Sequence, residues 1–314
     1  MKPDITFSHA GFRWLQRLPD KVQRNGRRLS ENTRKSYARE FCYLCDTLAD
    51  LPLDAIKQEV IRDLNARMHA NGYSAATIGL RNTVLELVVH SITEDGNPIF
   101  PLKIKPDFCN VPIINPEEQK APCATREDVE RALKHVELAG PIACAAGLGL
   151  RVSEILALFV GNCPDADSWD GDAAIIHIRK TLKTPSAKRS IPISPKLNDF
   201  LRHIAANKAQ GDLLFSVPRN RFYNLLEIRK LPPPHAYRRF FATVKDQANM
   251  NGNVLKKIMG HSKGRDVTDR YSRAADDMDF VRAEMERCPL GFRLPAIRTV
   301  PEAPEQHEAQ AVSA

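Results

Sequence analysis

Residues 258–273 read IMGHSKGRDVTDRYSR, a stretch in which a Gly-His-Ser turn precedes a tyrosine. This tyrosine, Tyr271, stands among several arginines. Its phenol has an ordinary pKa of about 10, so it needs such a cationic neighbourhood to act as a nucleophile near neutral pH. A tyrosine is more often a half-buried core residue, and this stretch alone leaves both interpretations open.

Arg151 lies upstream in GLGLRVSEILAL (147–158), at the start of a stretch whose apolar spacing predicts a buried helix. An arginine at the mouth of such a helix is anchored, and its planar guanidinium suits the oxygens of a phosphate. A surface arginine that pairs with Glu154 is an equally good interpretation of this motif taken alone.

His235 and Arg238 stand three residues apart in PPHAYRRFFAT (233–243), so a helix would place them on one face. A lone pair of this kind more often reflects a structural histidine. Together with the two stretches above, however, it completes an ordered set of cations, hydrogen-bond donors and one phenolic nucleophile. Cleavage of a phosphodiester requires these groups where no metal is held by clustered carboxylates, and we see no such cluster in the sequence. The sequence therefore predicts neither a metal nor a cofactor.

The composition is that of an ordinary globular protein of 314 residues, with 43% hydrophobic and 27% charged side chains. The net charge of +8 favours a polyanionic partner without proving one. No stretch has the length and apolarity of a membrane span, and the N-terminus lacks the apolar core of a signal peptide. Seven cysteines, an odd number spread over both halves, are typical of reduced thiols. We therefore expect a cytoplasmic protein with no membrane partner.

The first part of the chain is predicted to be helical and to form a domain of its own. Six prolines between residues 98 and 122 interrupt regular structure, so the domain boundary is placed there and the first domain covers 1–115. Apolar residues at helical spacing predict three helices in this domain, over 32–48, 54–70 and 74–92.

The second domain, 116–288, is predicted to be mainly helical with a small β-hairpin. Residues 173–179 and 189–193 have the character of short strands, and a basic turn at 180–188 joins them. The last segment, 289–314, is rich in proline, alanine and glutamate, which predicts a flexible tail. The expected fold class is mainly α with a small sheet (α+β).

The ordered set Arg, Lys, HxxR, GH and Tyr resembles the catalytic domain of the tyrosine recombinases, the phage-integrase and Xer-type site-specific recombinases. The resemblance runs from about Thr125 to Tyr271, and the helical first domain is similar to the SAM-like core-binding domain of that family. It implies an integrase that breaks and rejoins DNA through a 3′-phosphotyrosyl intermediate without metal or ATP. It also implies double-stranded recombination sites as partners, a homo-oligomer that is a tetramer on synapsed DNA, and DNA-bending accessory proteins. The expected location is the cytoplasm, associated with the nucleoid, in a protein encoded by a bacterium or a phage.

The resemblance assigns roles to individual residues. Arg151 and Arg238 would clamp the phosphate, and His261 would donate a further hydrogen bond to the transition state. His235 would give general acid–base help, and Tyr271 would attack the scissile phosphate.

In the tyrosine recombinases a lysine in a β-hairpin turn protonates the leaving 5′ oxygen. Lys180, Lys183 and Lys188 all lie in the predicted turn, and Lys183, just after the first strand, matches the family pattern best. The choice among the three lysines stays open. Tyr237 and Arg239 depart from the family pattern beside the HxxR motif, which bears on the subfamily and not on the chemistry.

Basic side chains near the N-terminus are predicted to follow the phosphates of DNA. The predicted DNA contacts are Arg24, Arg27, Arg28, Arg34 and Lys35, with Lys180 and Lys188 of the hairpin turn. Two other functions remain open, namely a type IB topoisomerase that relaxes supercoils and a non-catalytic DNA-binding protein on the same fold. The target sequence and the direction of recombination cannot be predicted.

Overall fold

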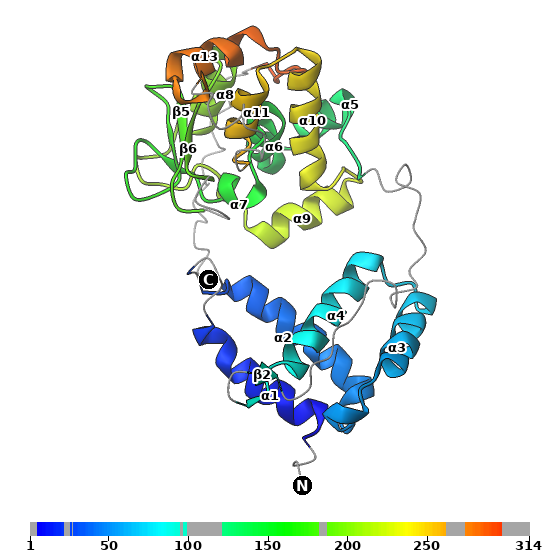
Figure 1. Cartoon of the computed structure of the whole chain (residues 1–314). Helices are drawn as coiled ribbons and strands as arrows, with labels where there is room; N and C mark the ends of the chain where they lie inside the picture. Colours follow the sequence, from blue (N-terminus) through cyan, green and yellow to red (C-terminus); the bar gives the residue numbers. More distant parts are fainter. Residues whose placement is uncertain are drawn as a thin grey trace, which may run out of the picture. The chain divides into compact units, whose positions relative to one another are not determined.

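The computed structural model describes residues 5–21, 26, 28–94, 97–98, 121–181, 187–261 and 274–296. The chain forms two compact units, Met1–Gln119 and Lys120–Ala314 (Figure 1). The domain boundary predicted between residues 115 and 116 lies outside the described residues. Within the described part of the chain, no helix is both long enough and apolar enough to span a bilayer.

The first unit is a bundle of helices. Its helices are α1 (Phe7–Arg17), α2 (Glu31–Leu48), α3 (Gln58–Ala70) and α4 (Ala75–Val89), followed by the short strands β1 (Thr93–Glu94) and β2 (Asn97–Pro98). Ser30 and Ser74 cap α2 and α4 by accepting hydrogen bonds from backbone N–H groups of the first turn. The predicted helix over 54–70 begins later, at Gln58, because Leu53–Ala55 forms a separate 3₁₀ turn.

The core of this unit forms where the apolar faces of its helices meet. Phe7, Phe41, Leu44 and Leu85 are almost completely buried there. α1 approaches α2 so closely that a Cβ on Gly11 would collide with the ring of Phe41. The helix α1 was not among the three predicted helices.

The second unit is mainly helical and is built around one buried helix. Its helices are α5 (Arg126–Ala132), α6 (Val136–Leu148), α7 (Val152–Ile155), α8 (Pro195–Ile204), α9 (Arg219–Ile228), α10 (Pro234–Gln247), α11 (Gly252–Ile258) and α13 (Met278–Arg287). α6 is buried from Leu138 to its end and packs mainly against α10 (Figure 1). Thr125 and Asp128 form the reciprocal capping box that starts α5.

A four-stranded sheet completes the second unit. The strands β3 (Phe159–Val160), β4 (Ser168–Asp170), β5 (Ile175–Ile178) and β6 (Arg189–Pro192) lie in sequence order. β3 pairs with β4 in parallel, and the other pairs are antiparallel. β5 and β6 form the predicted hairpin, with Ile176 opposite Ile191. The fold class predicted from the sequence is therefore confirmed, while β3 and β4 were not predicted.

The segment after α13 packs against the second unit for part of its length. Phe292 is only 7% exposed and belongs to the main hydrophobic core. The buried ammonium of Lys245, on α10, donates to the carbonyls of Cys288 (3.0 Å) and Pro289 (3.1 Å). The prediction of a flexible tail from residue 289 was therefore wrong for the residues up to Phe292, because a tightly packed aromatic ring anchors them. Residues 297–314 lie outside the described residues.

Candidate active site

Arg151 lies where two helices meet in the second unit. Gly149, in the left-handed conformation with φ of 63°, ends α6, and Arg151 then occupies the N-cap of α7. The backbone N–H of Arg151 donates to Oε2 of Glu154 (2.8 Å), and its guanidinium donates to Oε1 (2.9 Å). The side chain of Arg151 remains 24% exposed, so it is anchored at its base and still accessible to a ligand.

Glu154 is completely buried and binds a second arginine. Arg189, at the start of β6, donates to Oε1 (3.1 Å) and Oε2 (2.9 Å) of the same carboxylate. The side chain of Arg189 also donates to the carbonyls of Ile258 (2.6 Å) and Ala187 (2.7 Å). Each oxygen of Glu154 therefore accepts two hydrogen bonds, and Arg151 and Arg189 share one buried counterion.

Burial and charge act in opposite directions on Glu154. Burial by itself raises the pKa of a carboxyl group, because the charged form loses its hydration. The hydrogen bonds and charges of Arg189 and Arg151 outweigh this effect, and the pKa of Glu154 lies below its ordinary value. Glu154 is therefore ionised at neutral pH and offsets part of the positive charge of the site.

Arg238, on α10, connects the ends of two other helices. Its guanidinium donates to the carbonyl of Gly149, at the end of α6, and to that of Met259, just after α11. The residue is 3% exposed, and burial, followed by the charge of Arg151, lowers its pKa to about 10. Because this value is still well above 7, Arg238 is a permanent cation held by carbonyl groups at two helix ends.

His261 is in contact with this cation. The Nε2 atom of His261 lies 3.2 Å from Nη2 of Arg238. His235, in the first turn of α10, is close enough to contribute to the lowering of the pKa of His261. Burial and then the neighbouring arginines lower the pKa of His261. The imidazole is therefore neutral at pH 7, so one ring nitrogen can donate while the other accepts.

Gly260 allows the chain to pass between the two arginines that share Glu154. Its φ is 62°, and its carbonyl accepts a hydrogen bond from Arg151 (3.3 Å). A Cβ at this position would lie 2.7 Å from Nη1 of Arg189. Only glycine combines this backbone conformation with such a close approach, which explains the glycine before His261.

Comparisons with known proteins agree with this fold. No family model matches the chain. The chain is 26% identical over 287 residues to the transposase from transposon Tn916 of Enterococcus faecalis, an alignment that covers 77% of this chain and 69% of the transposase. Among solved structures, it is similar to the Tn1549 transposon integrase bound to circular intermediate DNA, with a TM-score of 0.59, 20% identity, and coverage of 90% of this chain and 99% of that one. The chain therefore has the fold of the tyrosine recombinases.

A second solved structure has the same fold as this chain. A lambda integrase tetramer bound to a Holliday junction matches with a TM-score of 0.57 and 15% identity, covering 86% of this chain and 80% of the lambda chain. At this identity the match concerns the fold alone.

The structure brings together four of the residues predicted for the active site. Arg151, Arg238 and His261 lie around Gly260, and His235 lies near His261. Lys183 and Tyr271 lie outside the described residues, so the complete catalytic set remains a prediction.

The predicted DNA contacts lie in both units. In the second unit, Lys180 and Lys188 are exposed on either side of the hairpin turn. In the first unit Arg28 is exposed, Arg34 is half-buried, and Lys35 forms an ion pair with Glu31 (2.7 Å). Arg24 and Arg27 lie outside the described residues.

Sequence reasoning missed Arg189 and the double role of Glu154. The two interpretations of Arg151 are not exclusive, because it does pair with Glu154, but in a buried site that also holds Arg189. A signal for Arg189 was present. Alternation along β6 places it on the same inward face as Ile191, and an inward arginine in a strand requires a buried acidic partner.

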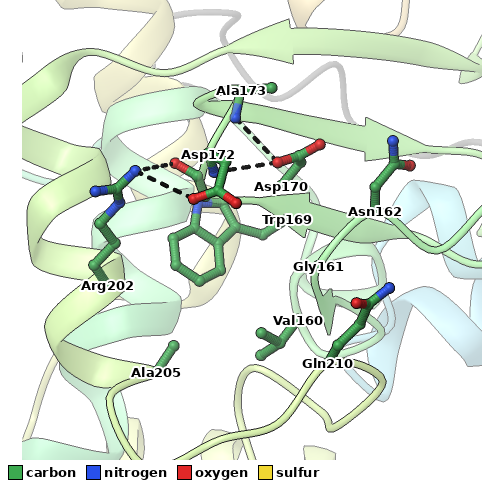
Figure 2. A pocket seen from close by; sticks show the side chains of 11 residues that line it. Val160, Gly161, Asn162, Trp169, Asp170, Asp172, Ala173, Arg202, Ala205 and Gln210 are labelled. Carbon is green, nitrogen blue, oxygen red and sulfur yellow. Dashed lines mark hydrogen bonds and ion pairs between the residues drawn. The ribbon is translucent and has the colours of Figure 1, made fainter.

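A hollow of about 610 Å³ lies beside the sheet and shares no residue with the arginine cluster. Trp169, Arg202 and Gln210 are among the residues that line it (Figure 2). Arg202 donates to the carbonyl of Gly171 (2.8 Å), and Asp170 accepts from backbone N–H groups of its own turn. Because its charged groups are bonded to their neighbours, we assign this hollow no part in the function.

Proposed function

We propose that this protein is a tyrosine recombinase, a site-specific DNA integrase that cleaves and rejoins DNA strands through a 3′-phosphotyrosyl bond to Tyr271, without metal or ATP. The observation that supports this best is the cluster of Arg151, Arg238 and His261, held by Glu154 and by carbonyls at helix ends. The similarity to transposon integrases does not favour a topoisomerase or a non-catalytic DNA-binding protein.

The arginine cluster is suited to a phosphate whose negative charge grows during the reaction. A guanidinium has five N–H donors, and the protein uses only some of those on Arg151 and Arg238. The remaining donors can bind the non-bridging oxygens of the scissile phosphate. Because the protein already fixes both side chains, they need no rearrangement as the pentacoordinate transition state forms.

In the proposed reaction, the phenolic oxygen of Tyr271 attacks the phosphorus atom as the bond to the 5′ oxygen breaks. His235 assists by accepting the phenolic proton, and Lys183 donates a proton to the leaving 5′ oxygen. His261 donates a hydrogen bond to a non-bridging oxygen. Rejoining is the reverse reaction, in which a 5′-hydroxyl displaces the tyrosine, so the bond energy is retained.

Several groups must act together to give an enzymatic rate. Loss of one well-placed transition-state donor costs about 10²–10³ in rate, and a general acid contributes about 10²–10⁴. Enzymes typically accelerate their reactions by about 10⁶ or more. No single cation of the cluster therefore accounts for the reaction, and their effects will not add independently.

We further propose that the recombinase acts on double-stranded recombination sites as a tetramer, in the nucleoid of a bacterium. Tn1549 integrase was solved with circular intermediate DNA and lambda integrase as a tetramer on a Holliday junction, which supports this assembly. Exposed basic side chains in both units, including Arg28 and Lys188, would bind the DNA backbone. DNA-bending accessory proteins would assist where the two sites must be brought together.

The proposal is tested with a suicide substrate, a duplex nicked near the cleavage point so that the cut strand diffuses away and the covalent adduct accumulates. A pool of nicked duplexes with randomised sequence supplies the unknown site, and adducts are recovered with the protein. We expect adducts with the wild-type protein and none with Tyr271→Phe, while both bind the selected DNA within a few-fold. Failure of the wild-type protein to form an adduct with any duplex in the pool would contradict the proposal.

A further inference from the structure

Asp167 is a buried carboxylate that the mechanism above does not use. It is 1% exposed and immediately precedes β4. Its Oδ1 accepts hydrogen bonds from the backbone N–H groups of Arg179 (2.6 Å) and Lys180 (2.7 Å), and its Oδ2 accepts one from Thr181 (3.0 Å). Three successive N–H groups at the end of β5 therefore converge on one side chain, which fixes the direction in which the chain leaves the sheet.

The side chain of Arg179 reinforces the same connection. Its Nη1 donates to the carbonyl of Cys163 (2.7 Å) and to the hydroxyl of Ser168 (3.1 Å), and its Nη2 donates to Oδ1 of Asn162 (3.1 Å). The loop between β3 and β4 is therefore tied to the end of β5 by the backbone and by a side chain. A single loop thus holds the entry to the basic hairpin turn.

The exit from the turn is held as well, and this contact leads to the active site. Arg189, which begins β6, donates to the carbonyl of Ala187 (2.7 Å) and to both oxygens of Glu154. The described residues on either side of 182–186 are consequently fixed, one side by Asp167 and the other by Arg189. Arg189 shares Glu154 with Arg151, so the position of the exit is fixed relative to the arginines that would bind the phosphate.

We propose that Asp167 is a positioning residue for the lysine that protonates the leaving 5′ oxygen. This inference rests on the proposed function, in which Lys183 of the hairpin turn is the general acid. A general acid must lie within hydrogen-bond reach of the leaving oxygen, and a misplacement of about 1 Å can cost about 10² in rate. The last of the three contacts of Asp167 fixes the backbone at Thr181, which precedes Lys183 by two residues in the sequence.

The chemistry of the contact explains why an aspartate is needed. A carboxylate has two acceptor oxygens, and here they serve three N–H donors. An asparagine has the same shape but only one acceptor oxygen. Its NH₂ group would face at least one of the three N–H groups, and that hydrogen bond would be lost. Asp167→Asn therefore loosens the entry to the turn without changing the volume of the buried side chain.

The test separates protonation of the leaving group from the rest of the reaction. Two suicide duplexes of the selected sequence are compared, one with the natural 5′ oxygen and one with sulfur in its place at the scissile phosphate. A thiolate leaves without protonation, so cleavage of the sulfur substrate does not require the general acid. We expect Asp167→Asn to cleave the natural substrate about 10²-fold more slowly than wild type, and the sulfur substrate within a few-fold of wild type.

Two variants provide the controls. Asp165→Asn removes an exposed carboxylate of the same loop and should cleave both substrates like wild type. Lys183→Ala should show the same selective rescue by sulfur as Asp167→Asn. If the wild-type protein forms no adduct with either substrate, the proposed function itself is contradicted. If the wild-type protein is active, the difference between it and Asp167→Asn reports on Asp167 alone.

Three results would overturn the role of Asp167. The first is an Asp167→Asn variant that cleaves the natural substrate at the wild-type rate. The second is a variant slowed equally on both substrates, which would assign Asp167 to a step other than protonation. The third is a loss of folding in both Asp167→Asn and Asp167→Ala, measured by circular dichroism, which would assign it a purely structural role.

Discussion

Replacement of Glu154 by glutamine tests whether one buried carboxylate holds two arginines of the active site. The change keeps the size of the side chain but removes its charge and one of its two acceptor oxygens. Four hydrogen bonds now end on the carboxylate, two from Arg151 and two from Arg189. In the variant, the amide NH₂ would face two of these donors, and the buried guanidinium of Arg189 would lose its counterion.

The expected loss of stability follows from that geometry. Removing one partner of a buried ion pair costs about 3–5 kcal/mol, because the other charge remains in a low-dielectric site. Unfolding in urea, followed by circular dichroism, should therefore show a fall of about 3 kcal/mol or more in the free energy of unfolding of Glu154→Gln. Glu137→Gln is the matched control, because its pair with Arg221 is exposed and should contribute less than about 1 kcal/mol.

A double variant separates the charge from the packing. Glu154→Leu combined with Arg189→Met removes both buried charges and should be more stable than Glu154→Gln, since apolar replacements of similar volume are tolerated in place of a buried pair. A Glu154→Gln variant as stable as Glu137→Gln would show that Glu154 is not an essential counterion for Arg189. A double variant less stable than Glu154→Gln would likewise contradict a loss caused by the unpaired charge of Arg189.

Three further predictions concern neighbouring groups. Gly260→Ala would place a side chain on a left-handed residue, with its Cβ 2.7 Å from Arg189. We expect this variant to form adducts at least about 10-fold more slowly while its DNA binding stays within a few-fold of wild type. An unchanged rate would contradict the close packing around Gly260. Burial lowers the pKa of Lys245 from 10.5 to about 8. Between these pH values the unfolded chain therefore binds more protons than the folded chain. The free energy of unfolding should rise with pH across this window by about 3 kcal/mol. Urea unfolding at pH 7.5 and 10.5 checks this, and a Lys245→Met variant with the same rise would refute it. Burial lowers the pKa of His261 and Arg238 adds the largest charge effect, so Arg238→Met should raise this pKa toward its ordinary value; an unchanged NMR titration of His261 would count against it.

The parts of the fold that could be predicted depend on neighbours in the sequence. Capping by Ser74 acts within one turn of helix, so local residue types predicted the start of α4. The β5–β6 hairpin was also readable, because two short stretches that contain isoleucines flank a basic turn. β3 has two residues and β4 has three, too few for any alternation to be recognised. The packing of Phe292 depends on a distant core, and the composition of its own segment indicated the opposite.

The sequence predicted which residues form the active site, but it did not predict the contacts that hold them in place. The sequence indicated Arg151, Arg238 and His261 as candidates, but the sharing of Glu154 with Arg189 joins segments that are distant along the chain. Nor does any local pattern show that Asp167 serves the end of β5. Such contacts arise from the tertiary fold, and only the alternation along β6 gave an advance indication of one of them.

The decisive feature of the proposed reaction is the covalent bond between Tyr271 and DNA, and the amino acid that carries this bond can be identified. Adducts formed on a selected suicide duplex in buffer containing EDTA would be digested with nuclease and protease and analysed by mass spectrometry. We expect a peptide with a 3′-phosphonucleotide on Tyr271, in the same yield with and without EDTA. A nucleotide on any other residue, or an adduct that EDTA abolishes, would contradict it.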